Sequence, residues 1–355
     1  MSPDPRPNLK DLPVDELRAE LGREGIASYR ALQIASWLHA RGVEDPEEMS
    51  DLPRELRVRL AEVWRTRALD VESVQRSLDG TTKAVLQAAD GARIEAVAIP
   101  DDDRTTLCIS TQVGCPLACS FCATGALGFT RNLSTAEIVD QLARMRELLG
   151  EERRVTNVVF MGMGEPLLNL PNVLRAISLL LHPKGYGFAG RRVTVSTAGV
   201  VPRLRTLLEA APVNLAVSLH ATTDALRDEL VPLNRRFPLD VLLGELRALP
   251  QLSAKRPVFF EYTLMAGVND SVADAKRLIA LLDGIPSKVN VIPMNPHADS
   301  PYQPPDLSVA SRFLGELARA GLTVTLRRSR GADIDAACGQ LATRGLRDEA
   351  AGSAP

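Results

Sequence analysis

Residues 115–122 are Cys115-Pro-Leu-Ala-Cys119-Ser-Phe-Cys122, and this short segment is the most informative part of a 355-residue chain. Spacings of four and three residues allow three thiolates to hold one face of a cubane iron–sulfur cluster. The alternative is zinc, which normally takes a fourth Cys or His ligand at short spacing. Cys108 lies seven residues before the motif, and His182 and His220 are distant. We therefore expect Cys115, Cys119 and Cys122 to hold a 4Fe–4S cluster.

Three cysteine ligands leave the fourth iron of such a cluster open. An open iron can bind the amino and carboxylate groups of S-adenosylmethionine (SAM) and pass an electron to its sulfonium, which yields a 5′-deoxyadenosyl radical. The chain has five cysteines, an odd number, and four of them lie between Cys108 and Cys122. A disulfide framework is typical of even counts in secreted proteins, so metal or redox chemistry is favoured. We expect one 4Fe–4S cluster and SAM as cofactors.

The cysteine segment follows the first strand of a strand–helix repeat. The clearest helix begins with the capping box Ser134-Thr135-Ala136-Glu137 and has an apolar face. The repeat predicts an α/β fold with a parallel sheet, open or rolled into a full or partial barrel, whose chemistry gathers at the C-terminal strand ends. The strand candidates lie at 105–111, 155–162, 192–199, 213–220, 258–265, 288–294 and 322–328.

Polar residues follow several of these strands and predict a SAM pocket. Gly162-Met-Gly164-Glu165-Pro166 closes the second strand, where glycines let the backbone approach a ligand and Glu165 can accept hydrogen bonds from the SAM ammonium. Each polar strand end could instead be a satisfied structural residue. Together they outline one site, and the SAM contacts that we predict are Gly164, Glu165, Ser196, Ser218, Leu219, His220 and Asn295.

The chain divides by pattern into four parts. Residues 1–68 predict a helical module, with Asp11 as the cap of its first helix and Val63 among the inward-facing residues of its third. Residues 69–103 predict a β-hairpin linker with turns at Asp79-Gly80 and Asp90-Gly91. Residues 104–343 predict the barrel and a C-terminal loop, and 344–355 a disordered tail.

Charge and composition restrict the partners. The net charge is −2 and aromatic residues make up 4%, so RNA binding would need a local basic patch. Arg54, Arg57 and Arg65 on the third helix fit either a solvated face or such a patch. No segment approaches the roughly 20 apolar residues of a membrane span. The N-terminus is polar, so we expect a cytoplasmic protein with no membrane partner.

Two further cysteines narrow the reaction. Cys108 lies on the strand before the cluster motif, where a free Cys is commonly a small buried hydrophobe. Cys338 lies among small residues in RGADIDAACGQL (330–341), which suits an accessible thiol. From about Leu12 to Leu341 the chain resembles the RlmN family, bacterial radical SAM enzymes that methylate carbon 2 of adenosine in RNA. The resemblance rests on long segments: CPLACSFCATGALGFTRNLSTAEIVDQ, MGMGEPLLN, RRVTVSTAG, NLAVSLHA, IPMNP and RGADIDAACGQL.

The resemblance implies a partial (β/α)6 radical SAM barrel behind an N-terminal helical RNA-contacting domain. It also implies two SAM molecules per methylation. The first methylates Cys338, and the second supplies the radical that removes hydrogen from the S-methyl group. The carbon then adds to the adenine ring, and Cys108 attacks the Cys338 sulfur to release the product, leaving a transient disulfide that must be reduced. Glu95 matches the proton acceptor of the family, although whether Glu95 or Cys108 takes the ring proton stays open.

The implied substrates are an adenosine at the peptidyl transferase centre of 23S rRNA and, in some members, the adenosine next to the anticodon of certain tRNAs. The nearest alternative is a Cfr-type enzyme, which methylates carbon 8. Peptide-modifying radical SAM enzymes often need auxiliary clusters, for which two spare cysteines are too few. We also expect an electron donor such as flavodoxin or ferredoxin, and a monomer. Candidate phosphate contacts are Arg131, Lys184, Arg191, Arg192, Arg235, Arg236, Arg327 and Arg328.

Overall fold

One continuous mixed sheet organises the molecule. The computed structural model describes residues 4–151, 153–297, 300–327 and 329–342, and in these residues ten strands follow the order β1-β2-β3-β4-β7-β8-β9-β10-β11-β12. Strands β1 to β4 pair antiparallel, and β4 then pairs in parallel with β7. The antiparallel strands are β1 (Leu69–Arg76), β2 (Thr82–Ala88), β3 (Arg93–Asp101) and β4 (Arg104–Cys108). The linker strands therefore extend the main sheet and do not form a separate one.

From β4 onward the neighbouring strands are parallel, as the strand–helix repeat predicts. Strands β4 and β7 to β11 give the six strands of the predicted partial barrel, and β12 adds a seventh parallel strand at the edge. β1 and β12 both remain edges, so the barrel is open. These strands are β7 (Asn157–Phe160), β8 (Val193–Thr197), β9 (Asn214–Ser218), β10 (Val258–Leu264), β11 (Ser287–Pro293) and β12 (Thr323–Leu326).

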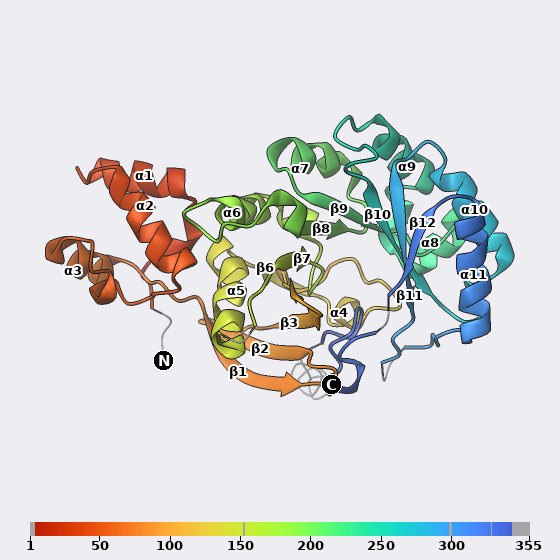
Figure 1. The fold of residues 1–355 in the computed structure, drawn as a ribbon, viewed down its shortest axis with the longest axis horizontal. Coiled ribbons are helices and arrows are strands. Elements are labelled where there is room, and N and C mark those ends of the chain that lie inside the picture. Colours follow the sequence, from red (N-terminus) through yellow and green to blue (C-terminus); the bar gives the residue numbers. More distant parts are fainter. Residues whose placement is uncertain (1–3, 152, 298–299, 328, 343–355) are drawn as a thin grey trace, which may run out of the picture.

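Helices connect the parallel strands and cover the sheet (Figure 1). The capping box at Ser134 is present: its side chain accepts from the backbone N–H of Glu137, whose carboxylate accepts from the backbone N–H of Ser134. The helices of this part are α4 (Ala123–Ala126), α5 (Thr135–Leu149), α6 (Leu170–Leu181), α7 (Leu204–Ala210), α8 (Asp224–Leu230), α9 (Leu239–Ala248), α10 (Val272–Leu282) and α11 (Leu307–Arg319). A short two-stranded sheet of β5 (Gln112–Gly114) and β6 (Phe129–Asn132) flanks the cysteine segment.

The N-terminal helices α1 (Val14–Arg23), α2 (Tyr29–Ala35) and α3 (Arg54–Val63) lie at one end of the molecule (Figure 1) and have their own apolar core. Two local predictions were wrong. Val63 is 38% exposed, because α3 ends there and turns its last residue outward. Asp11 does not cap α1; its carboxylate accepts from the backbone N–H of Ala136 and so satisfies the first turn of α5.

A buried charge network joins this helical module to α5. Lys10 donates to Asp140 at 2.5 Å and also to Glu44, and both Lys10 and Asp140 are fully buried. Asp140 accepts from the backbone N–H groups of Ala68 and Leu69 as well. One carboxylate therefore fixes the end of the module and the start of β1.

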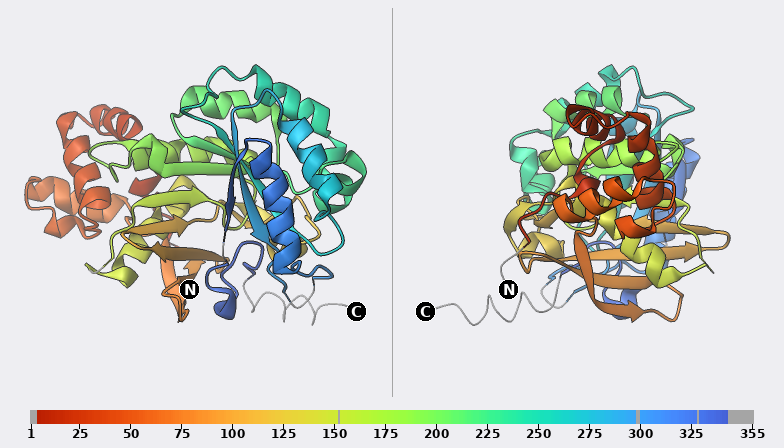
Figure 2. Two further views of the ribbon diagram at one scale, coloured as in Figure 1. Left: turned by 45° about the vertical axis from the view of Figure 1, so that its right-hand side comes forward. Right: turned by 90° about the vertical axis from the view of Figure 1, so that its left-hand side faces the viewer.

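The C-terminal segment returns from β12 to the antiparallel strands (Figure 2). The Ser77 hydroxyl donates to Asp333 at 2.6 Å, and the backbone N–H of Gly331 donates to Asp79 at 2.9 Å. Gly331 lies in the left-handed region, and an added Cβ would meet Thr81 at 2.8 Å. The predicted tail at 344–355 and Arg328 lie outside the described residues. No described helix has the length and apolar character needed to cross a membrane.

Candidate active site

The cysteine segment forms a tight loop between β5 and α4. Gly114 begins it with a positive φ, and an added Cβ would meet the carbonyl oxygen of Gly128 at 1.9 Å, so only glycine fits. The backbone N–H of Cys115 donates to that same oxygen at 2.7 Å. The backbone N–H of Cys122 donates to the carbonyl of Cys119 at 3.1 Å, which closes the turn. These contacts hold the loop in a shape that brings all three cysteines to one pocket.

The three thiols fit a cubane cluster better than a single metal ion. Within the described residues, no three His, Cys, Asp or Glu side chains converge on a position for one ion. A cubane binds each thiolate to a different iron, so its ligands surround a volume and do not meet at a point. All three cysteines line one cavity of about 160 Å³, and burial raises the pKa of the Cys115 thiol to about 12. Thiolates become stable in such a place only when a metal binds them.

The Gly162–Pro166 segment packs against the strand of the cysteine motif. An added Cβ on Gly162 would lie 2.8 Å from the backbone of Ile109, and one on Gly164 would lie 2.6 Å from Gln112. The glycines therefore allow two segments of this chain to approach each other, and both also line the pocket, where the sequence predicts that they approach a ligand. Glu165 is buried and accepts from the backbone N–H groups of Leu167 at 3.0 Å and Ala198 at 2.8 Å. Burial raises the pKa of its carboxyl against these hydrogen bonds.

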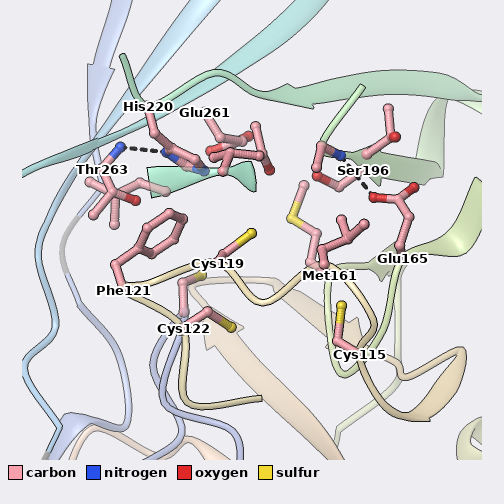
Figure 3. Close-up of a pocket in the computed structure, with 18 of the residues that line it drawn as sticks. Cys115, Cys119, Phe121, Cys122, Met161, Glu165, Ser196, His220, Glu261 and Thr263 are labelled. Carbon is pink, nitrogen blue, oxygen red and sulfur yellow. Dashed lines mark hydrogen bonds between the residues drawn. The ribbon is translucent and has the colours of Figure 1, made fainter. Parts of the chain in front are cut away.

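His220 follows β9 in the left-handed region, with φ of 59°. Its Nδ1 accepts from the backbone N–H of Thr263 at 3.0 Å, which leaves the proton of the neutral ring on Nε2. Burial lowers the pKa of His220 to about 3, so the ring is neutral. Its ring contacts Phe121 edge to face, with centroids 4.7 Å apart (Figure 3). His220 therefore offers an N–H donor next to the cysteine loop.

One pocket brings together most of the predicted site residues (Figure 3). The predicted residues that line it are Cys115, Cys119, Cys122, Gly164, Glu165, Ser196, Ser218, His220 and Cys338. We call Glu165, Ser196, Ser218 and His220 the strand-end wall. Leu219 and Asn295 are not among the lining residues. The side chain of Leu219 lies in the hydrophobic core, and Asn295 donates to the carbonyl of Cys338 at 3.1 Å.

Residues 331–341, which we call the Cys338 loop, close the other side of the pocket. Cys338 itself is exposed and also lines the cavity. Side chains and backbone groups from distant segments hold the loop in place. The Lys83 ammonium donates to the carbonyl of Asp335 at 3.2 Å. The backbone N–H of Ala123 donates to the carbonyl of Gly339 at 2.8 Å, and the Thr124 hydroxyl donates to the carbonyl of Leu341 at 2.5 Å. The cysteine loop and the Cys338 loop are thus joined directly.

Cys108 and Glu95 lie beneath the Cys338 loop and outside the pocket lining. Cys108 is buried, which raises the pKa of its thiol to about 12, and a charge on Cys338 raises it further. A negative charge on the Cys338 sulfur therefore disfavours the thiolate form of Cys108. Glu95 on β3 lies 3.6 Å from the Lys83 ammonium, and burial raises the pKa of its carboxyl although Lys83 lowers it. Its Oε2 has no hydrogen-bond partner among the described residues.

Sequence reasoning missed several lining residues, among them Glu261 and Thr263 on β10. Glu261 is buried, accepts from Asn290 at 2.8 Å, and lies 3.8 Å from the Arg327 guanidinium. Arg327, a predicted phosphate contact, therefore lines the pocket beside Glu261. Arg131, another predicted contact, already pairs with Asp90 at 2.7 Å and Glu137 at 2.8 Å. The only sequence signal for Glu261 is that it is a charged residue within a largely apolar strand, and this signal is weak.

Comparisons with known proteins cover the same segments. The family model for the Radical SAM superfamily matches residues 109–279, and that for the Ribosomal RNA large subunit methyltransferase N-terminal domain matches residues 7–65. The chain is 50% identical over 334 residues to the dual-specificity RNA methyltransferase RlmN of Geobacter sulfurreducens, covering 94% of this chain and 91% of that one. It is 49% identical over 333 residues to the protein of the same name from Syntrophobacter fumaroxidans, covering 94% and 97%.

A solved structure agrees with the fold. The crystal structure of a radical SAM methyltransferase from Sphaerobacter thermophilus matches with a TM-score of 0.88 and 43% identity, over 94% of this chain and 99% of that one. The predicted radical SAM fold and the resemblance stated from the sequence are both confirmed. Radical SAM enzymes use SAM and a 4Fe–4S cluster, which agrees with the three thiols in the pocket. The chain therefore belongs to the RlmN family of radical SAM RNA methyltransferases.

Proposed function

We propose that this chain methylates carbon 2 of an adenosine in 23S rRNA at the peptidyl transferase centre, and of the adenosine 3′ of the anticodon in some tRNAs. Relatives that share about half of its residues are named dual-specificity RNA methyltransferases. The observation that carries the proposal is the position of Cys338. It lines the same cavity as the three cysteines of the cluster motif, and a charge on its sulfur raises the pKa of a second thiol, that of Cys108.

Cys115, Cys119 and Cys122 would hold the cluster, and the strand-end wall would hold SAM. Glu165 already accepts two backbone N–H groups, yet a carboxylate has about four acceptor sites, so it can also receive an ammonium. His220 would donate through Nε2, and Ser196 and Ser218 offer hydroxyl groups from the same face. When bound, the cluster and SAM supply a carbon-centred radical in this pocket. Two SAM molecules are consumed for each methylation in this scheme.

Cys338 carries the methyl group. Its exposure allows the thiolate to reach the methyl group of a first SAM, since thiolate reactivity depends on access and on nearby cations. Burial raises the pKa of the Cys338 thiol, and the Arg327 guanidinium, which lines the same pocket, opposes part of that rise. The S-methyl group is then placed in the cavity where hydrogen can be removed from it. An electron-poor ring carbon cannot attack the electrophilic methyl group of SAM directly. It can be attacked by a carbon radical formed on the S-methyl group of Cys338, and for this reason the methyl group goes to Cys338 first.

Cys108 releases the product and Glu95 or Cys108 takes the ring proton. After the methylene radical has added to the ring and the ring proton has left, the Cys108 thiolate attacks the sulfur of Cys338 and an S–S bond forms. The bond from that sulfur to the transferred carbon breaks, the carbon takes up a proton to complete the methyl group, and the unpaired electron leaves through the disulfide to an electron acceptor such as the cluster. Both Glu95 and the Cys108 thiol are buried below the loop, and Glu95 has a raised pKa and an unpartnered Oε2, which suits a group that accepts a proton. A reductant restores both thiols.

The remaining partners follow from this chemistry. A one-electron donor such as flavodoxin or ferredoxin would reduce the cluster. We propose a monomer that works in the cytoplasm, where its RNA substrates are made. A target adenine in folded RNA must leave its stack before it can enter a pocket of this size.

The first test is the identity of the product. The reconstituted protein is incubated under anaerobic conditions with SAM, a reductant and an rRNA fragment, and the digested nucleosides are compared with standards by mass spectrometry. The proposal predicts 2-methyladenosine. An 8-methyladenosine product would assign the chain to the Cfr type and overturn the proposal. A Cys108→Ala variant should accumulate a covalent enzyme–RNA adduct, and normal turnover would refute the role of Cys108.

A further inference from the structure

Arg227 is a buried arginine behind the pocket, on helix α8. It is 1% exposed and donates to three backbone carbonyls: Leu219 at 3.1 Å, Ala198 at 2.7 Å and Ser218 at 3.2 Å. Its fourth hydrogen bond goes to the side chain of Asn234 at 2.9 Å. The carbonyls belong to the C-terminal ends of β8 and β9, which carry Ser196 and His220. Arg227 therefore lies directly behind the strand-end wall.

The charge of Arg227 has no ion-pair partner in the described part of the chain. Its hydrogen bonds go to carbonyl and amide oxygens, which carry no net charge. Burial lowers the pKa of Arg227 to about 10, so the side chain is still a cation near neutral pH. An isolated charge is costly to bury, because it loses its hydration and gains no opposite charge in return. A buried cation without an ion-pair partner is therefore expected beside a site where a negatively charged group binds.

Two carboxylates, those of Asp224 and Asp228, reach Arg227 only through the Asn234 side chain. The cysteine loop is a second source of negative charge and lies against the same helix. The backbone N–H of Ser120 donates to the carbonyl of Leu230 at the end of α8, 3.2 Å away. Apolar side chains of the loop, including Leu117 and Phe121, pack in one cluster with Leu230. Cys119 itself packs against this cluster, so a negative charge on its sulfur acts on Arg227. The loop that holds the cluster ligands therefore rests on the helix that carries the unpaired cation.

We propose that Arg227 is the internal counter-cation of the iron–sulfur cluster and that its charge makes the cluster easier to reduce. Three thiolates give the cluster site a negative charge, and reduction adds one more. A nearby fixed cation stabilises the reduced state more than the oxidised state, and the net charge around a cluster is one of the factors that set its potential. Arg227 touches neither ligand nor substrate, so it acts as a positioning and tuning residue. The proposal rests on the cluster assigned in the proposed function.

The test is a redox titration of the reconstituted holoenzyme without SAM, followed by electron paramagnetic resonance of the reduced cluster. Arg227→Gln removes the charge and keeps part of the hydrogen bonding. Arg227→Lys keeps the charge and loses the planar guanidinium with its fixed N–H donors. Arg256→Gln is the matched control. Arg256 also donates to backbone carbonyls, those of Val213 and Ala211. It precedes β10 and these carbonyls precede β9, so the contact lies at the N-terminal ends of the strands, away from the pocket.

We expect Arg227→Gln to lower the ratio of reduced to oxidised cluster about tenfold at a fixed potential, which for one electron corresponds to about 59 mV. Arg227→Lys and Arg256→Gln should stay within about twofold of the unmodified protein. If Arg227→Gln acquires no iron but Arg227→Lys does, at unchanged potential, the charge is required even for assembly, which supports the proposal.

Three results would overturn it. They are an unchanged potential in Arg227→Gln, an equal shift in Arg227→Lys, and failure of both variants to acquire iron, which would mean that the arginine is needed for its shape. Iron and sulfide content of the unmodified protein separates this outcome from failure of the proposed function. If the unmodified protein holds a cluster and makes 2-methyladenosine, only the role of Arg227 is in question.

Discussion

The strand-end wall and the Cys338 loop face each other across one pocket, but they are built differently. The wall stands on parallel strands whose polar groups are buried and largely satisfied by neighbouring backbone, as with Glu165 and His220. The Cys338 loop has almost no regular structure, and a few long-range hydrogen bonds from β2, α4 and the segment after β11 hold it. A fixed wall suits cofactor binding. A tethered loop suits a thiol that must meet a cofactor, an RNA base and then Cys108.

The largest expected effects come from removing one thiol from the cysteine loop, beside the wall, and one from the Cys338 loop. Cys122→Ala should abolish both iron binding and methylation, because the cluster loses a ligand. Cys338→Ala should abolish methylation completely while iron content stays close to that of the unmodified protein. Iron analysis and mass spectrometry of the digested nucleosides measure these outcomes. Loss of iron in Cys338→Ala would show that the loop also supports the cluster.

The rigidity of the wall is tested at Gly162. An added methyl group would lie 2.8 Å from the backbone of Ile109, which cannot move independently of the sheet. Gly162→Ala should lower the free energy of unfolding by about 1–3 kcal/mol, the usual cost of overpacking. Gly244→Ala in α9 is the control, since nothing lies within 4 Å of its added Cβ. That variant should be neutral or more stable by up to about 1 kcal/mol in chemical denaturation.

The tethers of the loop are tested at Asn295. Asn295→Ala removes the hydrogen bond to the carbonyl of Cys338, and a typical bond of this kind contributes about 1 kcal/mol. We expect about a fivefold fall in kcat/KM for RNA, with iron content unchanged. Asn214→Ala, which removes a bond to the carbonyl of Arg191 far from the pocket, should leave kcat/KM unchanged. A change confined to the KM for SAM would instead make Asn295 a direct SAM contact.

The smallest effect concerns the pH dependence of stability at Glu261. Burial raises the pKa of this carboxyl although Arg327 opposes the shift. Because the pKa of Glu261 in the folded state exceeds its value in the unfolded state, the folded state holds the proton more tightly. The stability that the protonated carboxyl contributes is therefore lost as the pH rises through the raised pKa. Glu261→Gln should therefore stabilise the cluster-free protein more at pH 8 than at pH 5 in urea unfolding. An equal effect at both pH values would contradict the raised pKa.

The regular parts of the molecule could be predicted from the sequence, because their signals are local. The capping box at Ser134 starts α5 as expected, and the alternation of strand and helix gives the parallel sheet. The spacing of the three cysteines is also local, and they meet in one pocket. In each case a few neighbouring residues contain the whole signal.

Features that depend on distant contacts could not be predicted. Gly162 and Gly164 pack against residues 109–112, about fifty positions earlier, and their local pattern does not reveal this contact. No local pattern in the sequence singles out Arg227, and only the structure shows the three carbonyls around it. Asp11 looked like the cap of the next helix and instead caps α5, because the helical module docks there.

The most direct test of the central claim, that Cys338 carries the methyl group before RNA receives it, uses SAM with a deuterated methyl group. If Cys338 is the carrier, one deuterium leaves the S-methyl group and one hydrogen from the substrate takes its place. The 2-methyladenosine product should then contain two deuteriums, and the lost deuterium should appear in 5′-deoxyadenosine. A product with three deuteriums would show direct transfer from SAM to RNA and would contradict the account.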